Sequence, residues 1–267
     1  MGSEMCIRDR IYVGPPIYAA AEYNVLGRLM RYVPMHAPLH PDRVLYVFIY
    51  AGVAVESLTA AGASLSASAT GKTSDSRVEG GNLLSAAIVL QGAIELVFMG
   101  MVALMHHRCA KHKMLMPNIW RLCLMLYGTS SLLLTRCIFR AVEAFSTYTV
   151  IECNNSCGFF LYHEWYLYVF EAAPMVVYSY WLNFMHPGRF LPSSNSRFLD
   201  VDGKTERIGP GWIDRRSKLE TFADPFDIDG LIKGAPSHQK FWMKASDWPT
   251  ASDGSFALGT ASNVRKA

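Results

Sequence analysis

Two stretches of sequence decide the fold: residues 120–145 read WRLCLMLYGTSSLLLTRCIFRAVEAF, and residues 163–192 read HEWYLYVFEAAPMVVYSYWLNFMHPGRFLP. Each contains an apolar run of about 20 residues or more, long enough for a helix that crosses the roughly 30 Å hydrocarbon core of a membrane. The loop between them holds no Lys or Arg. The pair therefore predicts two membrane-spanning helices joined by a loop on one side of the bilayer.

Charged residues interrupt both apolar runs: Arg136, Arg140, Glu143, Glu164 and Glu171. A charge in the hydrocarbon region costs roughly 2.5–3.5 kcal/mol on insertion scales, so such a side chain normally faces a bundle interior and has a partner. The three charges on the first helix are spaced i, i+4 and i+7 and share one stripe, and the two glutamates on the second share a face. We predict that the arginines of one helix pair with the carboxylates of the other.

This predicted ionic cluster has two interpretations. A bidentate Arg–carboxylate pair satisfies most of the guanidinium donors, and such a pair in a low-dielectric bundle can serve only to hold two helices in register. In the second interpretation the same residues also line a polar cavity that binds a substrate. Arg136, Arg140, Glu143, Glu164 and Glu171 are therefore candidate substrate-binding residues.

Glu56 and Glu95 are single carboxylates in otherwise apolar segments. Burial without a nearby cation favours the protonated form of a carboxyl group. One interpretation makes either residue a proton-coupling or headgroup-binding group, so both join the candidate substrate-binding residues. The other makes them hydrogen-bonded neutral acids, or partners of Arg28 or Arg136.

Apolar segments of about 20 residues or more recur along the chain. They cover residues 15–33, 44–69, 82–105, 119–145 and 163–185. Loops rich and poor in Lys and Arg alternate between them, and the positive-inside rule then puts the C-terminus in the cytoplasm. The predicted fold is an all-α, polytopic transmembrane helix bundle over residues 11–192. Within it, Gly62 and Ser66 predict close helix–helix approach, and Pro174 predicts a kink.

The composition fits a membrane protein and argues against several other classes. Of the 267 residues 51% are hydrophobic, too many for an ordinary soluble domain, and the net charge of +3 gives no reason to expect nucleic-acid binding. The six cysteines include no C-x-x-C pair, and no Gly-rich nucleotide loop or nucleophile motif is present. We therefore expect no enzyme activity, no cofactor and no metal.

The loop at residues 146–162 carries Glu152 as its only charge, together with Cys153 and Cys157. Outside the membrane these two cysteines are a candidate disulfide, and Asn154 begins an N-glycosylation pattern. The alternative interpretation is an ordinary short loop without either modification.

The two ends of the chain differ in character from its middle. Residues 193–267 are rich in Ser, Gly, Pro and Asp without sustained periodicity, so we predict a disordered cytoplasmic tail, and its partner is unknown. Residues 1–10, MGSEMCIRDR, resemble a translated sequencing-adapter fragment. We expect them to be an artefactual leader rather than part of the fold.

Several segments resemble a known family. The specific ones read LTRCIFRAVE, HEWYLYVFEAAPM and HPGRFLP. They closely resemble the fungal lipid-translocating exporter family, seven-helix membrane proteins linked to aminocholesterol resistance and sphingoid-base export. In addition, PPIYAAAEYNVLGRLMR resembles that family's third helix, and the segment around Glu56 and AAGAS resembles its fourth. The resemblance covers residues 15–192 and implies that the family's first two helices are missing here.

The same resemblance implies transport or flipping of amphipathic lipids outward across the plasma membrane, without a nucleotide-binding domain. We expect the substrate to be a cationic or zwitterionic lipid such as a sphingoid base, and the partners to be membrane lipids. Glu164 and Glu171 would attract the amine headgroup while Arg136 and Arg140 balance the charge. The alternative is a seven-helix sensor or receptor that signals through its tail and affects lipid traffic indirectly; a membrane-embedded enzyme comes third.

Overall fold

A computed structural model gives the fold of the chain. It describes residues 2–37, 40–68, 74–148, 165–192, 194–200, 202–209, 211–212, 217, 220 and 241–251. The candidate disulfide residues Cys153 and Cys157 and the candidate glycosylation residue Asn154 lie outside the described residues.

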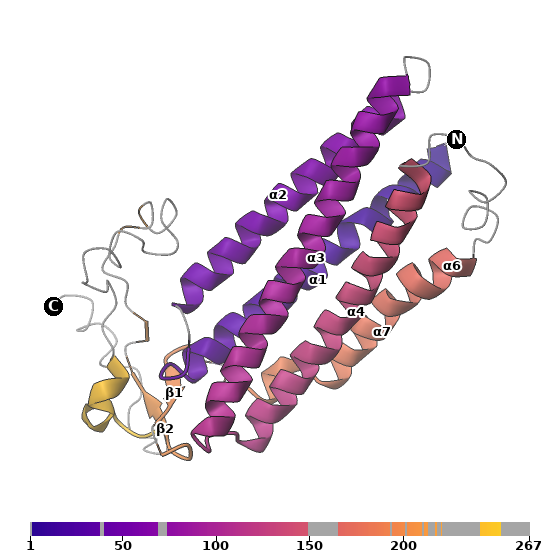
Figure 1. Ribbon diagram of the computed structural model, residues 1–267. Coiled ribbons are helices and arrows are strands. Elements are labelled where there is room, and N and C mark those ends of the chain that lie inside the picture. Colours follow the sequence, from indigo (N-terminus) through magenta and orange to yellow (C-terminus); the bar gives the residue numbers. More distant parts are fainter. Residues whose placement is uncertain are drawn as a thin grey trace. The chain divides into compact units, whose positions relative to one another are not determined.

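Long helices make up most of the described chain (Figure 1). They are α1 Gly2–Tyr32, α2 Pro41–Ser68, α3 Ser74–Lys111 and α4 Pro117–Tyr148. The last helix follows in three parts: α6 Trp165–Leu167, the π-helical turn η1 Tyr168–Ala172, and α7 Ala173–Phe184. Proline begins both α2 and α4, a position where its missing N–H costs no hydrogen bond. The prediction of an all-α bundle is confirmed.

Three of these helices are long and apolar enough to cross a membrane: Pro41–Leu65, Val78–Lys111 and Pro117–Phe145. Large apolar side chains are exposed along them, including Val53, Val97, Leu104 and Ile138. Lipid chains cover such a surface favourably, whereas water does not. The other two predicted spans are also helical, although α1 carries several charges and the last helix is divided. The chain is a multi-pass membrane protein.

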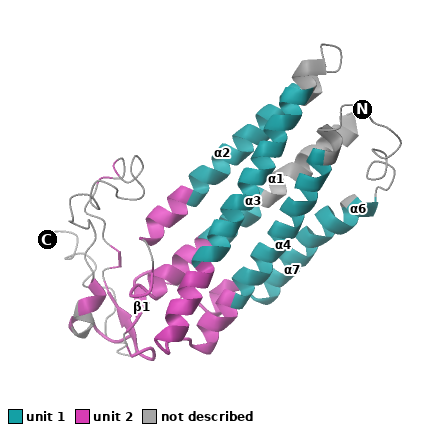
Figure 2. Ribbon diagram, in the orientation of Figure 1, with its two compact units in different colours: residues 1–23, 48–101, 124–185 teal, residues 24–47, 102–123, 186–267 magenta. Residues whose placement is uncertain are grey.

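The chain packs into two compact units, which Figure 2 colours separately. Unit 1 comprises residues 1–23, 48–101 and 124–185, and unit 2 comprises residues 24–47, 102–123 and 186–267. Each of the helices α1 to α4 contributes residues to both units.

Aromatic packing and close backbone approach hold unit 1 together. The ring centroid of Tyr23 in α1 lies 4.7 Å from that of Phe48 in α2 and 5.2 Å from that of Phe98 in α3. The helices α2 and α3 approach at Gly62, where an added Cβ would lie 2.9 Å from the backbone nitrogen of Leu84. This confirms the predicted close approach at Gly62, since any larger side chain there would meet backbone.

Pro174 shapes the last helix of unit 1. It has no N–H to donate to the carbonyl of Phe170, four residues earlier, and the π-helical turn η1 lies immediately before it. The structure thus has a π-helical turn next to Pro174, a feature often found at functional sites, and the predicted kink stays a prediction. Glu171 belongs to this turn and is buried.

Unit 2 contains a β-hairpin that sequence reasoning did not predict. The strand β1, Arg197–Leu199, pairs antiparallel with β2, Glu206–Ile208. Phe198 and Leu199 are buried, and the Tyr32 hydroxyl of α1 donates a 2.8 Å hydrogen bond to Glu206. These residues belong to the predicted disordered tail, yet they gain enough apolar burial to form an ordered element.

Other described parts of unit 2 are short. A 3-10 turn, η2 at Pro187–Arg189, follows α7, and a second one, η3, spans Phe241–Asp247. The ring of Phe241 packs edge-on against Phe198, with 5.2 Å between the centroids. Most of residues 213–240 and all of residues 252–267 lie outside the described residues.

Candidate functional site

An ionic cluster lies in unit 1 between α4 and the last helix. Arg136 donates a 2.9 Å hydrogen bond from Nη2 to Oε1 of Glu171, and Arg140 donates one of 2.9 Å from Nε to the same oxygen. Arg140 Nη2 also bonds this oxygen, and its Nη1 lies 3.2 Å from Oε2 of Glu143. Two guanidinium groups of one helix thus converge on a single carboxylate of another.

Local helix geometry positions these groups. Arg136 and Arg140 are one turn apart on α4, so both face the same neighbour, and Glu143 follows Arg140 at i+3. Glu171 meets them from the π-helical turn η1. Glu171 and Arg136 are 2% and 6% exposed, so the pair is held away from solvent. Charge-assisted hydrogen bonds of this kind are about twice as strong as neutral ones.

The two oxygens of Glu171 have different surroundings. Oε1 accepts hydrogen bonds from both arginines. Oε2 is buried and accepts no hydrogen bond from any described residue. A buried carboxylate oxygen without a donor is costly, and a donor from a bound molecule relieves that cost. The cluster therefore offers an acceptor as well as a structural ion pair.

The structure brings together four of the predicted site residues and separates others. Arg136, Arg140, Glu143 and Glu171 form the cluster. Glu56 of α2 is half-buried and interacts electrostatically with Arg136, one of the two partners weighed for it. Glu164 lies outside the described residues.

Glu95 belongs to a different polar group in unit 1, and its partner Glu22 was not among the predicted site residues. Ser130 of α4 donates a 3.0 Å hydrogen bond from its hydroxyl to Oε2 of Glu22, and Glu95 of α3 lies within hydrogen-bonding reach of both. Glu22 sits on a predicted span that also carries Arg28 and Arg31, and these charges obscured its burial. The available signal was an acid about two helical turns inside a predicted apolar span.

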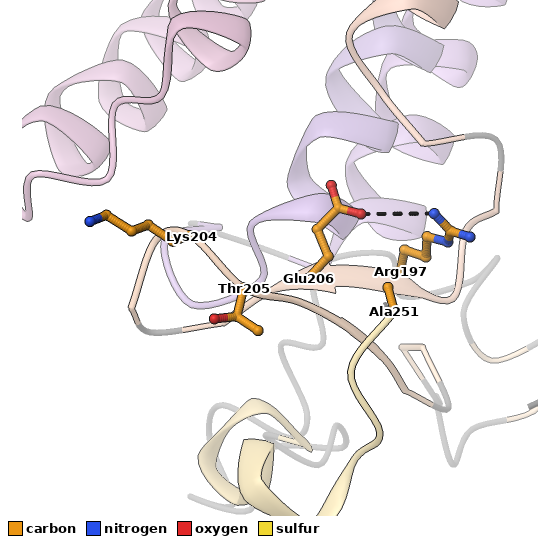
Figure 3. Close-up of a pocket in the computed structure, with 5 residues that line it drawn as sticks. All are labelled: Arg197, Lys204, Thr205, Glu206 and Ala251. Atoms are coloured by element: carbon orange, nitrogen blue, oxygen red, sulfur yellow. Dashed lines mark ion pairs between the residues drawn. The ribbon is translucent and has the colours of Figure 1, made fainter. Parts of the chain in front are cut away.

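Unit 2 has a pocket that is polar and exposed (Figure 3). It is lined by Arg197, Lys204, Thr205, Glu206 and Ala251. Arg197 and Glu206 form an ion pair across it at 3.9 Å, and both side chains are more than one third exposed. Such surface pairs contribute about 0–1 kcal/mol. No set of three metal-ligating side chains exists among the described residues.

Comparison with known proteins places this architecture in a family. The family model described as RTA1 like protein matches residues 8–194, which include the helices and the whole ionic cluster. A lipid-translocating exporter-like protein RTA1 of Leptosphaeria maculans is 35% identical over 80% of this chain and 42% of its own length. A protein of the same description from Ajellomyces capsulatus is 30% identical over 81% of this chain and 69% of its own length.

A third relative, Protein RTM1 of Saccharomyces cerevisiae, is 29% identical over 62% of this chain and 52% of its own length. The chain thus spans less than half of the Leptosphaeria relative and about half of the yeast one. No solved structure matches. The family match covers well over half of the 267 residues, and the resemblance seen in the sequence is confirmed: this chain belongs to the RTA1-like family of membrane proteins.

Proposed function

We propose that this protein moves an amphipathic lipid with a cationic or zwitterionic headgroup, such as a sphingoid base, across the membrane. The printed names of two relatives describe lipid-translocating exporter-like proteins, which supports a role in lipid transport. The specific part of the proposal, the charge of the headgroup, rests on Glu171. Its buried Oε2 accepts no hydrogen bond from any described residue, and an ammonium group carries three donors and no acceptor.

The charge balance of unit 1 supports a cationic ligand. Among the side chains that the structure describes there, carboxyl groups that are buried or half-buried outnumber guanidinium groups. The carboxyls are Glu22, Glu56, Glu95, Glu143 and Glu171, and the guanidiniums are Arg136 and Arg140. A low-dielectric interior with surplus acid favours a bound cation and disfavours a bound anion.

The arrangement suggests how a headgroup is held. The arginines fix Oε1 of Glu171 by hydrogen bonds, which leaves Oε2 available to the headgroup without reorganisation of the side chain. Glu143, whose side chain is 34% exposed, is the more accessible acid of the cluster and receives the ammonium group first. The hydrocarbon chain of the lipid stays against apolar helix faces such as that around Ile138.

A reconstitution assay tests this function without any variant. Purified full-length protein in liposomes is supplied with a fluorescent long-chain base and, separately, with its N-acetylated analogue, and transfer between leaflets is followed by a membrane-impermeant quencher. We expect the protein to accelerate transfer of the free amine at least about tenfold more than that of the uncharged analogue. Equal acceleration of both lipids would remove the role of Glu171, and no acceleration of either would remove the transport function.

Variants then locate the headgroup. Glu171→Gln should abolish transfer of the amine, and Glu171→Asp, which keeps the charge but shortens the side chain, should retain part of it. Glu79→Gln serves as the control, because Glu79 is an exposed acid on α3. Normal transfer by well-folded Glu171→Gln would contradict the proposed headgroup contact.

We also propose that the protein resides in the plasma membrane with its C-terminus in the cytoplasm. The plasma membrane is what the family resemblance implies. The orientation is supported by the charge of the loops: the segment after the last helix is basic, whereas residues 146–162 hold no Lys or Arg. Protease protection in sealed vesicles tests the orientation. Cleavage of the tail and of the 146–162 loop from the same side would overturn it.

A further inference from the structure

The second polar group of unit 1 has an unusual composition for a membrane interior. Glu22 of α1 and Glu95 of α3 are 0% and 4% exposed. Their carboxyl groups interact with each other, and Ser130 of α4 donates a 3.0 Å hydrogen bond to Oε2 of Glu22. Two buried acids therefore share one site, with no part in the Arg136–Arg140–Glu171 cluster.

The neighbours of this pair come from every helix packed against it. They are the hydroxyls of Thr129 and Ser130 on α4 and of Tyr178 on α7, with Tyr23 of α1 and Cys137 of α4 nearby. The helix α2 contributes the Phe48 ring, stacked on Tyr23. All of these groups are neutral hydroxyls, a thiol or an aromatic ring; none supplies a positive charge.

Each neighbouring hydroxyl proton already has an acceptor. Ser130 donates its single proton to Oε2 of Glu22, and Tyr178 donates its own to the backbone carbonyl of Tyr18. Thr129 donates to backbone carbonyls of its own helix. Each hydroxyl has only one hydrogen to give.

Two acceptor atoms remain without a donor. Oε1 of Glu22 and Oε1 of Glu95 are both buried and accept no hydrogen bond from any described residue. Two ionised carboxylates so close together, with no cation, repel each other strongly in a low-dielectric interior. A proton carried by one carboxyl and donated to the other removes the repulsion and supplies the missing donor at once.

We propose that Glu22 and Glu95 form a proton-binding site that holds one exchangeable proton between their carboxyl groups. The proton comes from water and returns to water, and no other bond is made or broken. A metal cation is a poorer occupant, since the site offers two carboxyls and hydroxyls that are engaged elsewhere, and sodium or calcium takes more oxygen ligands than this.

The site is joined to the ionic cluster through two helices. Ser130 and Arg136 both belong to α4, about 9 Å apart along its axis, and Tyr178 and Glu171 both belong to the last helix. Loss of the proton adds one negative charge to an interior that already holds surplus acid. If the proposed lipid function holds, on which this step alone rests, deprotonation strengthens binding of a cationic headgroup and protonation weakens it.

Infrared difference spectroscopy tests the proton site directly. Full-length protein in liposomes is moved between neutral and alkaline pH, and the carbonyl stretch of a protonated carboxylic acid is followed, with ¹³C-labelled glutamate to assign it. We expect the unmodified protein to show this band at neutral pH and to lose it on alkalinisation. Its absence at neutral pH would overturn the proposal, and this measurement needs no variant.

Variants assign the band to the pair. Glu22→Gln and Glu95→Gln should each remove it, whereas the control Glu79→Gln should leave it unchanged, because Glu79 is exposed. Helix content measured by circular dichroism confirms that each variant is folded. A band that survives both substitutions, or that disappears on addition of sodium at constant pH, contradicts the assignment to a shared proton.

A transport measurement tests the connection to lipid movement separately. We expect the pH dependence of amine-lipid transfer to be lost in Glu95→Gln while transfer itself continues. Transfer that stays pH-dependent in this variant would overturn the coupling but not the proton site. A protein that moves no lipid but keeps the infrared band would refute the proposed function and leave the proton site standing.

Discussion

Unit 1 buries acidic groups in two places and stabilises them in two different ways. Glu171 receives hydrogen bonds from two guanidinium groups, whereas Glu22 and Glu95 are surrounded by hydroxyls and by each other. Both sites are nearly inaccessible, with Glu171 at 2% and Glu22 at 0% exposure. Burial is therefore equal, and the difference lies in what neutralises the charge.

This comparison shows that the partner, more than the depth, decides the chemistry of a buried acid. The carboxylate between the arginines is balanced by their positive charge, and its Oε2 accepts no hydrogen bond from any described residue. An acid beside another acid, without a cation, is stabilised by a proton. One membrane bundle thus holds a fixed charge on α4 and the last helix, and an exchangeable charge between α1 and α3.

The largest effect is expected from removal of the fixed charge. Glu171→Gln removes the carboxylate that accepts hydrogen bonds from both buried arginines, and breaking a buried ion pair costs about 3–5 kcal/mol. We expect a loss of this size in the free energy of unfolding, measured in mixed detergent micelles. Glu143→Gln should cost at most about 1 kcal/mol, because that side chain is 34% exposed. Equal losses in both variants would contradict the proposed difference between the two acids.

Substitutions at Glu95 should separate proton donation from packing. Glu95→Ala removes the donor that Glu22 needs and leaves a cavity, so we expect a loss of about 1–3 kcal/mol in the free energy of unfolding. In Glu95→Gln the amide N–H can donate to Glu22 in place of the proton, and the loss should stay below about 1 kcal/mol. The same unfolding assay compares them. A larger loss in Glu95→Gln than in Glu95→Ala would count against the shared proton.

Pro174 links the two sites, because Glu171 and Tyr178 lie on either side of it. Pro174→Ala restores an N–H that can bond to the Phe170 carbonyl, so we expect η1 to become regular α-helix. The number of residues between Glu171 and Tyr178 does not change, but the tighter winding of the turn gives Glu171 a different direction relative to Tyr178.

The coupling energy between Arg140 and Glu171, measured by a double-mutant cycle, should then fall by about 1–2 kcal/mol in the Pro174→Ala background. Ala173→Gly is the control, since it alters the same segment without restoring a backbone donor. An unchanged coupling energy would mean that the π turn does not set the position of Glu171.

The smallest effect concerns His36, which lies outside the membrane helices, and the pH dependence of the free energy of unfolding. Burial lowers the pKa of His36 below its ordinary value of 6.5, and the neighbouring His112 and Arg108 lower it further. Its Nε2 lies 3.1 Å from the Met114 sulfur, within hydrogen-bonding distance. The folded protein therefore binds fewer protons than the unfolded one just below pH 6.5.

Stability supplied by neutral His36 should be present above about pH 6.5 and fall as the pH drops, with a slope of at most about 1.4 kcal/mol per pH unit. We expect His36→Gln to flatten the pH dependence of the free energy of unfolding between roughly pH 7 and 5. The matched substitution at the exposed His107 should leave it intact. A steeper curve in His36→Gln would reverse the sign of this argument.

The apolar segments already determine most of the helical fold. In a membrane the backbone N–H and C=O groups of an apolar segment must be hydrogen-bonded within the protein, and only a helix achieves this within one segment. The helices predicted at residues 44–69, 82–105 and 119–145 are therefore located correctly apart from their ends. Spacing on one helix placed Arg136 and Arg140 on a common face. The same sequence features support membership of the RTA1-like family.

Only the tertiary structure decided which side chains from different helices interact with each other. Glu22 and Glu95 are 73 residues apart and lie on different helices, and no periodicity within either helix relates them. The π turn around Glu171 depends on how the chain relieves the missing hydrogen bond at Pro174, and the hairpin at Arg197–Leu199 depends on burial of Phe198. A sequence records which groups need partners; packing between distant segments decides which partners they obtain.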